Sequence, residues 1–529
     1  MGQEVDPDAL GPDRLREHRA KLQQDLTALA GMLAGDRSPL GRVFDAGAPE
    51  VGLELELVLT DPATGAPARC NEDVLARIAG TPDAALWGPE ISAHTLELNA
   101  PPTTLAGAGL AELERGLRSR LDAVGARARE AGARLLMTGI LPTLAPEHLA
   151  PGWMTRSPRY RALQEAVLAA RGEDLELDIR PPGGRRDGGA EGLRHQLGSL
   201  AAEGACTSTQ VHLKVAPEDF ADTWNAAQLL MGPQVALGAN SPFALGRRVW
   251  AETRIPLFTQ SVDVRSREHA RTGVAPRVFP GDEWLRPGSR SGPGADPHGA
   301  RELFAQNVRC FPPLLPQSSE EDPLAELAAG RVPALPELCL HGGTVWRWNR
   351  PVYDVTPARG GLPARPHLRV ENRVLPAAPT VLDAVTDAAV WLGAVRGLRE
   401  AGPDPTALLP HAAAVDGLFD AARHGLGAHL PWPGLGRVDA RRLLLDVVLP
   451  LAADGLAAAG VEGAVADRYL EVARARAASG RNGATWQVRT AAALEARGAD
   501  RPAALAGLVE RYADHMEAGA PVHTWPLET

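Results

Sequence analysis

The chain has few cysteines. Four occur in 529 residues, and no two of them have Cys-x-x-Cys spacing. A zinc ribbon or a redox-active dithiol requires closely spaced cysteines, so the spacing argues against both. We expect structural thiols at Cys70, Cys206, Cys310 and Cys339, and a single reactive cysteine stays open as the alternative, without a local motif to support it.

Long apolar runs and basic blocks are also absent. The longest apolar stretch, residues 443–466, is interrupted by Asp446, Pro450, Asp454 and Glu462, which would be costly in hydrocarbon. The first ten residues have no apolar core of the kind found in a secretory signal. The net charge is −10, and the arginines are interspersed with acidic residues and form no long basic block. We therefore expect a cytoplasmic protein with neither a membrane nor a nucleic-acid partner; the sequence does not indicate an oligomeric state.

Common nucleotide-binding motifs are missing as well. No Walker A sequence occurs, and Gly107-Ala108-Gly109 is too short for a dinucleotide fingerprint. A nucleotide bound by this chain must be held without a P-loop.

What is present fits a globular α+β protein. Hydrophobic residues make up 44% and charged residues 23% of the chain. Helices and strands alternate without a βαβ rhythm, which favours a mainly antiparallel sheet. Helices are predicted at residues 13–33, 110–131, 217–239 and after Pro379, and strands at 51–59, 95–99, 134–138, 207–215, 344–349 and 367–374. Long surface loops are predicted at 180–192 and 277–299.

Three regions follow from this pattern. Residues 1–40 form an N-terminal helical segment, residues 41–400 form the mixed region, and residues 401–529 form a helical C-terminal region without a strand signal. Within the predicted strand 344–349, Trp346 and Trp348 share one face, where a packed aromatic surface is a commoner arrangement than a nucleobase platform.

The sharpest local feature is residues 52–57, in which apolar and acidic residues alternate strictly. Glu54 and Glu56 therefore share one strand face, with leucines on the other. Two carboxylates about 7 Å apart on a sheet repel each other unless solvent or a cation compensates them. Taken alone, this pattern fits a solvated outer strand equally well.

Three further predicted strands have the same one-sided pattern. In each strand the polar residues share one face: Glu97 and Asn99 in the first, Gln210, His212 and Lys214 in the second, and His367, Arg369, Glu371 and Arg373 in the third. If these strands form one sheet, a single face gathers acids, histidines and arginines. Carboxylates bind Mg²⁺ and arginine binds phosphate, and phosphoryl transfer needs both.

In order and spacing, these residues resemble the glutamate-cysteine ligase superfamily, in particular its bacterial carboxylate-amine ligase branch. The resemblance covers roughly residues 51–393, with further likeness at 480–487 and 521–527. Six motifs carry it: Gly-x-Glu-x-Glu at Glu54 and Glu56, the acid pair Glu90 and Glu97, Val211-His212-Leu213, Ala239-Asn240-Ser241-Pro242-Phe243, Glu252-Thr253-Arg254 and Arg369-Val370-Glu371-Asn372-Arg373.

The resemblance implies a saddle-like antiparallel sheet flanked by helices, of the glutamine synthetase and guanido kinase kind, with residues 41–400 as the catalytic domain. It also implies an ATP-dependent ligase that joins an amino-acid carboxylate to an amine, as an amide of the γ-glutamyl type, through an acyl phosphate. Mg²⁺ is the implied metal, with Mn²⁺ as a substitute, and ATP is the co-substrate.

The same resemblance assigns roles by matched position. The implied metal ligands are Glu54, Glu56, Glu90, Glu97, His212 and Glu371. Arg254 and Arg373 are implied phosphate or acyl-phosphate clamps, and with Glu371 they form the implied catalytic set. Asn99 and Gln210 are implied substrate contacts.

The chain departs from its relatives at His94, where some carry an acid, and at Gln210, where a histidine is common. Glutamate with cysteine is one pair of substrates, and another amino acid, a small amine or a peptide fits as well. Two other functions stay open: a degenerate ligase fold that senses a nucleotide or an amino acid, and a hydrolase that uses a carboxylate pair.

Overall fold

The computed structural model describes residues 12–35, 38, 40–44, 49–182, 191–286, 299–358, 363–401 and 403–527. A seven-stranded sheet lies at its centre, with the order β10-β11-β7-β1-β3-β2 and with β4 paired to β1. Every strand pair in it is antiparallel. The strands are β1 Glu50–Thr60, β2 Trp87–Pro89, β3 Thr95–Thr104, β4 Arg134–Leu136, β7 Thr209–Val215, β10 Asn349–Thr356 and β11 Arg365–Asn372.

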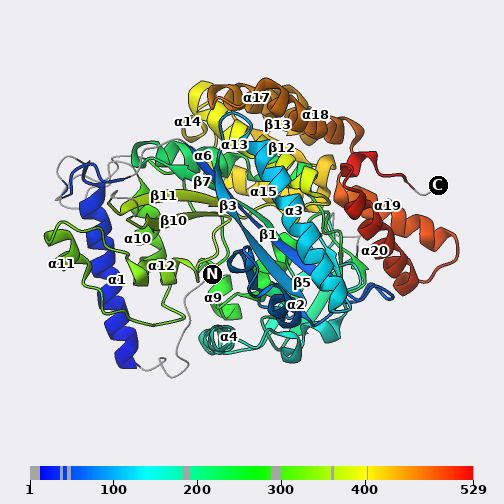
Figure 1. Ribbon diagram of the computed structural model, residues 1–529, viewed down its shortest axis with the longest axis horizontal. Helices are drawn as coiled ribbons and strands as arrows, with labels where there is room; N and C mark the ends of the chain where they lie inside the picture. Colours follow the sequence, from blue (N-terminus) through cyan, green and yellow to red (C-terminus); the bar gives the residue numbers. More distant parts are fainter. Residues whose placement is uncertain are drawn as a thin grey trace.

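The strand direction rotates strongly across this sheet, as Figure 1 shows for β10 and β11 against the long diagonal of β1 and β3. Such rotation follows from the right-handed twist of each strand. The predicted α+β class with a curved antiparallel sheet is therefore confirmed.

Helices surround the sheet. They are α1 Pro12–Leu33, α2 Asn71–Ile78, α3 Gly109–Glu130, α4 Pro158–Arg171, α5 Ala201–Gly204, α6 Phe220–Leu229, α7 Met231–Gly238, α8 Arg254–Ser261, α9 Arg267–Arg271, α10 Ala300–Cys310, α11 Pro323–Ala328, α12 Pro336–Gly342, α13 Val381–Ala401, α14 Pro405–Leu408, α15 His411–His424, α16 Ala440–Leu443, α17 Leu449–Ala458, α18 Gly463–Ser479, α19 Gly483–Ala496 and α20 Arg501–Ala518.

The apolar side of the sheet faces α3 and α13. Leu213 and Val215 of β7 line a small cavity together with Leu392 and Val395 of α13, and α3 contacts β3 and β4. The N-terminal helix α1 lies beside α10, α11 and α12 at the left of Figure 1, while α17 and α18 pack on α13 at the top. The opposite, polar side of the sheet is left for the candidate site.

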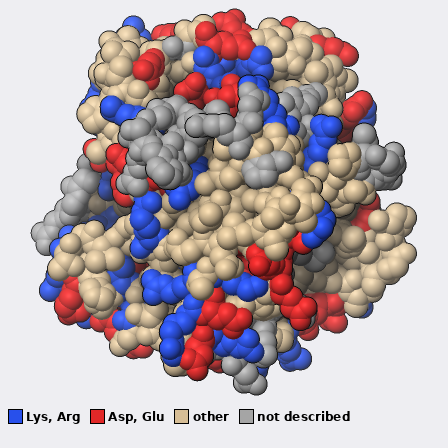
Figure 2. All heavy atoms as spheres, turned by 90° about the vertical axis from the view of Figure 1, so that its left-hand side faces the viewer, with Lys and Arg blue, Asp and Glu red and all other residues tan. Residues whose placement is uncertain are grey.

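Figure 2 shows the face at the left of Figure 1. Acidic and basic side chains are mixed on it, around a band of uncharged residues. The four cysteines are free thiols. Among the described residues, no helix is both long enough and apolar enough to cross a membrane.

Most predicted elements are present, but three differ. The strand predicted at 344–349 is wrong, since β10 begins at Asn349 and Trp346 and Trp348 are buried outside any strand. The helix predicted at 217–239 is two helices, α6 and α7, which are separated at Leu230.

The third difference lies in the C-terminal region, which is helical except for the hairpin of β12 His429–Trp432 and β13 Gly436–Asp439. Two other short hairpins lie outside the main sheet: β5 Leu175–Ile179 with β6 Leu193–Leu197, and β8 Phe243–Ala244 with β9 Arg247–Arg248. The described parts of the two predicted loops contain no helix and no named strand, and residues 183–190 and 287–298 lie outside the described residues.

Candidate active site

Strand register brings the predicted polar residues together. Glu56 of β1 pairs with Glu97 of β3, and Glu54 pairs with Asn99 on one side and Gln210 on the other. In the same way, His212 of β7 pairs with Glu371 of β11. Cross-strand partners point to the same side of a sheet, so the period-two pattern in four separate segments produces one continuous polar face.

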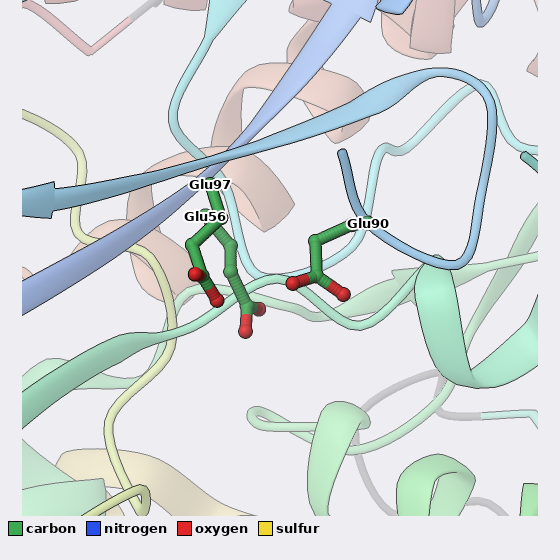
Figure 3. A group of neighbouring side chains, drawn as sticks. All are labelled: Glu56, Glu90 and Glu97. Carbon is green, nitrogen blue, oxygen red and sulfur yellow. The ribbon is translucent and has the colours of Figure 1, made fainter. Parts of the chain in front are cut away.

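Three glutamates at one end of this face form a candidate cation site. One carboxylate oxygen from each of Glu56, Glu90 and Glu97 lies within 4.8 Å of the others. Figure 3 shows Glu56 and Glu97 descending from two neighbouring strands toward Glu90, which follows β2. Among the described residues this is the only group of at least three His, Cys, Asp or Glu side chains with such spacing.

Local contacts fix the segment that carries Glu90. The Thr155 hydroxyl donates a hydrogen bond of 2.5 Å to the Glu90 carbonyl oxygen, and the Tyr160 hydroxyl donates one of 2.8 Å to the carbonyl oxygen of Pro89. These two bonds fix the backbone from which the Glu90 side chain extends toward Glu56 and Glu97.

The electrostatics of this triad favour a bound cation. Burial and the neighbouring Glu97 raise the pKa of Glu56 to about 7, against the opposing effect of Arg373. Burial also raises the pKa values of Glu90 and Glu97, with an added increase from Glu97 at Glu90 and from Glu54 at Glu97. Three closely spaced carboxylates with raised pKa values are a donor set that Mg²⁺, a hard cation that prefers oxygen, would ionise and hold.

A second group of potential ligands lies beside the triad. His212 Nε2 is 3.0 Å from Glu54 Oε1, and His212 Nδ1 is 3.9 Å from Glu371 Oε2. Burial opposes ionisation of Glu54, but His212 and Arg373 hold its pKa below the usual value. All six predicted ligands are thus divided between two adjoining clusters, with Glu56, Glu90 and Glu97 in the first and Glu54, His212 and Glu371 in the second.

Two arginines bind Glu371, which is fully buried. Arg373 Nη1 donates to Oε1 at 2.5 Å, while Arg350 donates to Oε2 from Nη2 at 2.6 Å and from Nε at 3.0 Å. These two cations lower the pKa of Glu371 strongly although burial opposes ionisation. Arg350 was not predicted as a site residue, because the strand prediction ended at Asn349 and so lost the register that pairs Arg350 with Glu371.

Gln210 connects the two clusters. Its Nε2 donates a hydrogen bond of 2.7 Å to Glu56 Oε1, and its Oε1 accepts one of 2.5 Å from Arg373 Nη1. Asn99 of β3 also binds a carboxylate of the triad, since its Nδ2 donates a hydrogen bond of 2.5 Å to Glu97 Oε1. Both amides therefore contact site residues directly.

Arg254 is placed differently from the other predicted residues. It is 2% exposed, and Nε donates to Glu252 Oε1 at 3.2 Å. Nη1 donates to the Arg373 carbonyl oxygen at 3.4 Å and Nη2 donates to that of Val374. The ring centroid of Trp348 lies 5.5 Å from its guanidinium carbon. Arg254 is therefore directed at the backbone beside Arg373 and not at the carboxylate triad.

His94 and Glu203 are two further titratable residues in the region of the triad. His94 does not join it, because its ring is buried beside Trp153, at 6.0 Å between centroids, and burial lowers its pKa to about 3. Glu203 of α5 was not predicted, and burial together with Glu56 raises its pKa to about 8. It lies in a short helix without periodic pattern, so the sequence offers no signal for it.

Comparison with known proteins identifies the family of this chain. Residues 50–504 match the model of glutamate-cysteine ligase family 2. A Rubrobacter xylanophilus protein provisionally named glutamate–cysteine ligase 2-3 is 28% identical over 302 residues, which cover 55% of this chain and 67% of that protein. A Mycolicibacterium vanbaalenii protein provisionally named glutamate–cysteine ligase 2-2 is 34% identical over 117 residues, which cover 22% of this chain and 29% of that protein.

A solved structure has the same fold. The crystal structure of glutamate–cysteine ligase from Francisella tularensis in complex with AMP superposes with a TM-score of 0.51 at 12% identity, covering 90% of each chain. Because the family model spans more than half of the sequence, the chain belongs to glutamate-cysteine ligase family 2, a family of ATP-dependent ligases that form carbon–nitrogen bonds.

Proposed function

We propose that this ligase transfers the γ-phosphoryl group of ATP to the carboxylate of an amino acid, and that an amine then displaces phosphate to give an amide. The observation that carries the proposal is the joining of two ligand clusters and two arginines on one sheet face, through Gln210. Phosphoryl transfer depends on positioning and charge neutralisation, and this face provides groups for both.

The residues fit divalent cations. Glu56, Glu90 and Glu97 would hold one ion, since their oxygens lie within 4.8 Å of one another and burial together with neighbouring carboxylates raises their pKa values. Glu54, His212 and Glu371 would hold another. When bound, Mg²⁺ would neutralise phosphate oxygens and orient them for transfer. Mn²⁺ would also suit the second group, because imidazole is an unusual Mg²⁺ ligand.

The protein's own cations would act on the reacting groups. Arg373 is 16% exposed in its side chain and Arg350 is 21% exposed, so both reach solvent from the Glu371 carboxylate. A phosphate or acyl phosphate approaching this edge would meet two rigid guanidinium forks. We assign Arg373 as the phosphate clamp and Arg350 as a second contact. Asn99 and Gln210 would orient the amino-acid substrate or the ligating carboxylates.

The substrates are the amino-acid carboxylate of a γ-glutamyl-type donor and an amine acceptor. Cysteine, another amino acid, a small amine and a peptide all satisfy the chemistry. Their side chains would be selected by the shape of the site around the two clusters.

The test is a phosphate-release screen with ATP and Mg²⁺ across pairs of carboxylates and amines, with mass spectrometry of the products. The expected result is stoichiometric ADP, phosphate and amide for at least one pair. Hydroxylamine added in place of the amine should give a hydroxamate, because it traps an acyl phosphate. ATP binding without turnover for any pair would instead support a sensor, and amide or glycoside hydrolysis without ATP would support a hydrolase.

A further inference from the structure

A buried ion pair lies behind the site, outside both ligand clusters. Glu252 is 0% exposed and Arg254 is 2% exposed, and Arg254 Nε donates to Glu252 Oε1 at 3.2 Å. A buried guanidinium needs a compensating charge, because a charge left alone in the interior is strongly unfavourable. Glu252 is the acid in contact with Arg254.

The other donors of Arg254 bind the segment that directly follows β11. Nη1 and Nη2 reach the carbonyl oxygens of Arg373 and Val374, which are consecutive residues more than 100 positions along the chain. The amide of Arg373 in turn donates to the Trp348 carbonyl oxygen at 2.9 Å, and the Trp348 ring lies against Arg254. Arg254 thus holds the backbone from which the Arg373 side chain extends toward Glu371 and Gln210.

The second oxygen of Glu252 is also occupied. Glu252 Oε2 accepts a hydrogen bond of 2.8 Å from the amide of Asn240. Asn240 is itself held by the C-terminal helices, since its Oδ1 accepts from Gln487 Nε2 at 2.8 Å and its Nδ2 donates to the Tyr512 hydroxyl at 2.8 Å. Glu252 therefore links the C-terminal region to Arg254, and Arg254 to the segment of Arg373.

We propose that Glu252 is a positioning residue for the ligase reaction: it orients Arg254, which fixes the backbone at Arg373 and Val374 and so the Arg373 guanidinium. This inference rests on the proposed function, in which Arg373 contacts the transferred phosphoryl group. A displacement of about 1 Å at a reacting group can cost roughly 10² in rate. The effect should fall on kcat, because Glu252 itself contacts no substrate.

The experiment compares Glu252→Gln with Asp387→Asn in the full-length protein. Asp387 of α13 is a matched control, since its side chain is 4% exposed and forms an ion pair of 2.5 Å with the buried Arg476 of α18. Each change removes one buried carboxylate charge and keeps the side-chain shape. We measure kcat, the KM for ATP, and hydrogen exchange of the peptide that spans residues 373–377, with each variant alone and combined with Arg373→Lys.

Glu252→Gln should lower kcat between about tenfold and 10²-fold with little change in KM. In the Arg373→Lys background it should lower kcat less than about twofold further, because coupled residues are not additive. Asp387→Asn should change kcat by the same small factor in both backgrounds. Exchange at 373–377 should rise in Glu252→Gln and not in Asp387→Asn. Arg254→Lys, which keeps the charge and loses the forked contact to two carbonyl oxygens, should reproduce the kcat pattern and serves if Glu252→Gln does not fold.

An unchanged kcat in Glu252→Gln, an equal loss with and without Arg373→Lys, or unchanged exchange at 373–377 would each overturn the positioning role. If wild-type protein releases no phosphate with any substrate pair, the proposed function fails. The exchange comparison then decides alone whether Glu252 holds the Arg373 segment.

Discussion

Glu56 and Glu97 are direct register partners on β1 and β3, so the antiparallel pairing itself brings their carboxylates to the same side of the sheet. Cross-strand like charges are destabilising unless something compensates them. Asn99 donates a hydrogen bond to Glu97, and Gln210 and the Ser208 amide donate to Glu56, but within the described part of the chain no lysine or arginine forms an ion pair with either carboxylate. A divalent cation is the compensation that this arrangement favours.

Replacing Glu97 by glutamine should weaken metal binding. The change removes one of three ligands, and even residues that only orient a ligand contribute roughly tenfold or more to metal affinity. The Mg²⁺ concentration for half-maximal phosphate release should therefore rise by at least about tenfold. Glu112→Gln is the control, because Glu112 is exposed on α3. Equal Mg²⁺ requirements for both variants would contradict the assignment of the triad.

The stabilising effect of Mg²⁺ should increase with pH. The pKa of Glu56 is raised from 4.5 to about 7, so without metal the folded state retains a proton that the unfolded chain has lost, and stability falls as pH rises between these values. Mg²⁺ binds the ionised carboxylates and removes this loss. We expect the Mg²⁺-induced increase in Tm, measured by differential scanning fluorimetry, to be larger at pH 8 than at pH 6. Equal increases at both values would show that these glutamates do not bind the ion.

The sequence predicted this polar face well because alternation of apolar and polar residues is a local signal. Glu54, Glu56, Glu97, Asn99, Gln210, His212 and Glu371 all lie where the period of two places them. Glu90 is outside any such pattern and was identified through the family motif alone.

Other features were not predictable from local pattern. Trp346 and Trp348 alternate with polar residues as in a strand, but they are buried in an irregular segment. The strand was therefore predicted too early in the chain, and the pairing of Arg350 with Glu371 was missed. The contacts of Arg254 with backbone oxygens at Arg373 and Val374 are tertiary, so no spacing in the sequence encodes them. Glu203 is likewise brought to the triad only by folding.

Arg369 within β11 and Arg373 just after it should differ in importance. Arg373 binds Glu371 and Gln210 within the site, whereas Arg369 pairs with the exposed Asp354 at 3.1 Å. Arg373→Gln should lower kcat by about 10² or more, as does removal of a donor to developing charge. Arg369→Gln should leave kcat nearly unchanged, because surface ion pairs contribute little. Steady-state phosphate release measures both, and similar losses in the two variants would refute a specific role for Arg373.

A methyl group at Gly483 should destabilise the junction between the C-terminal region and the site. A Cβ atom there would lie 2.0 Å from Asn240 Oδ1, so α19 would have to move away from the segment that Asn240 fixes. Forcing extra volume into a packed interior costs about 1–3 kcal/mol.

Gly463→Ala is the matched control for this change, because Gly463 also begins a helix, α18, and has no atom within 4 Å of the added methyl group. Urea unfolding should show a lower free energy of unfolding for Gly483→Ala and little change in it for Gly463→Ala. If Gly483→Ala keeps wild-type stability, α19 does not pack closely on Asn240. In that case α19 does not act on Glu252 through this contact.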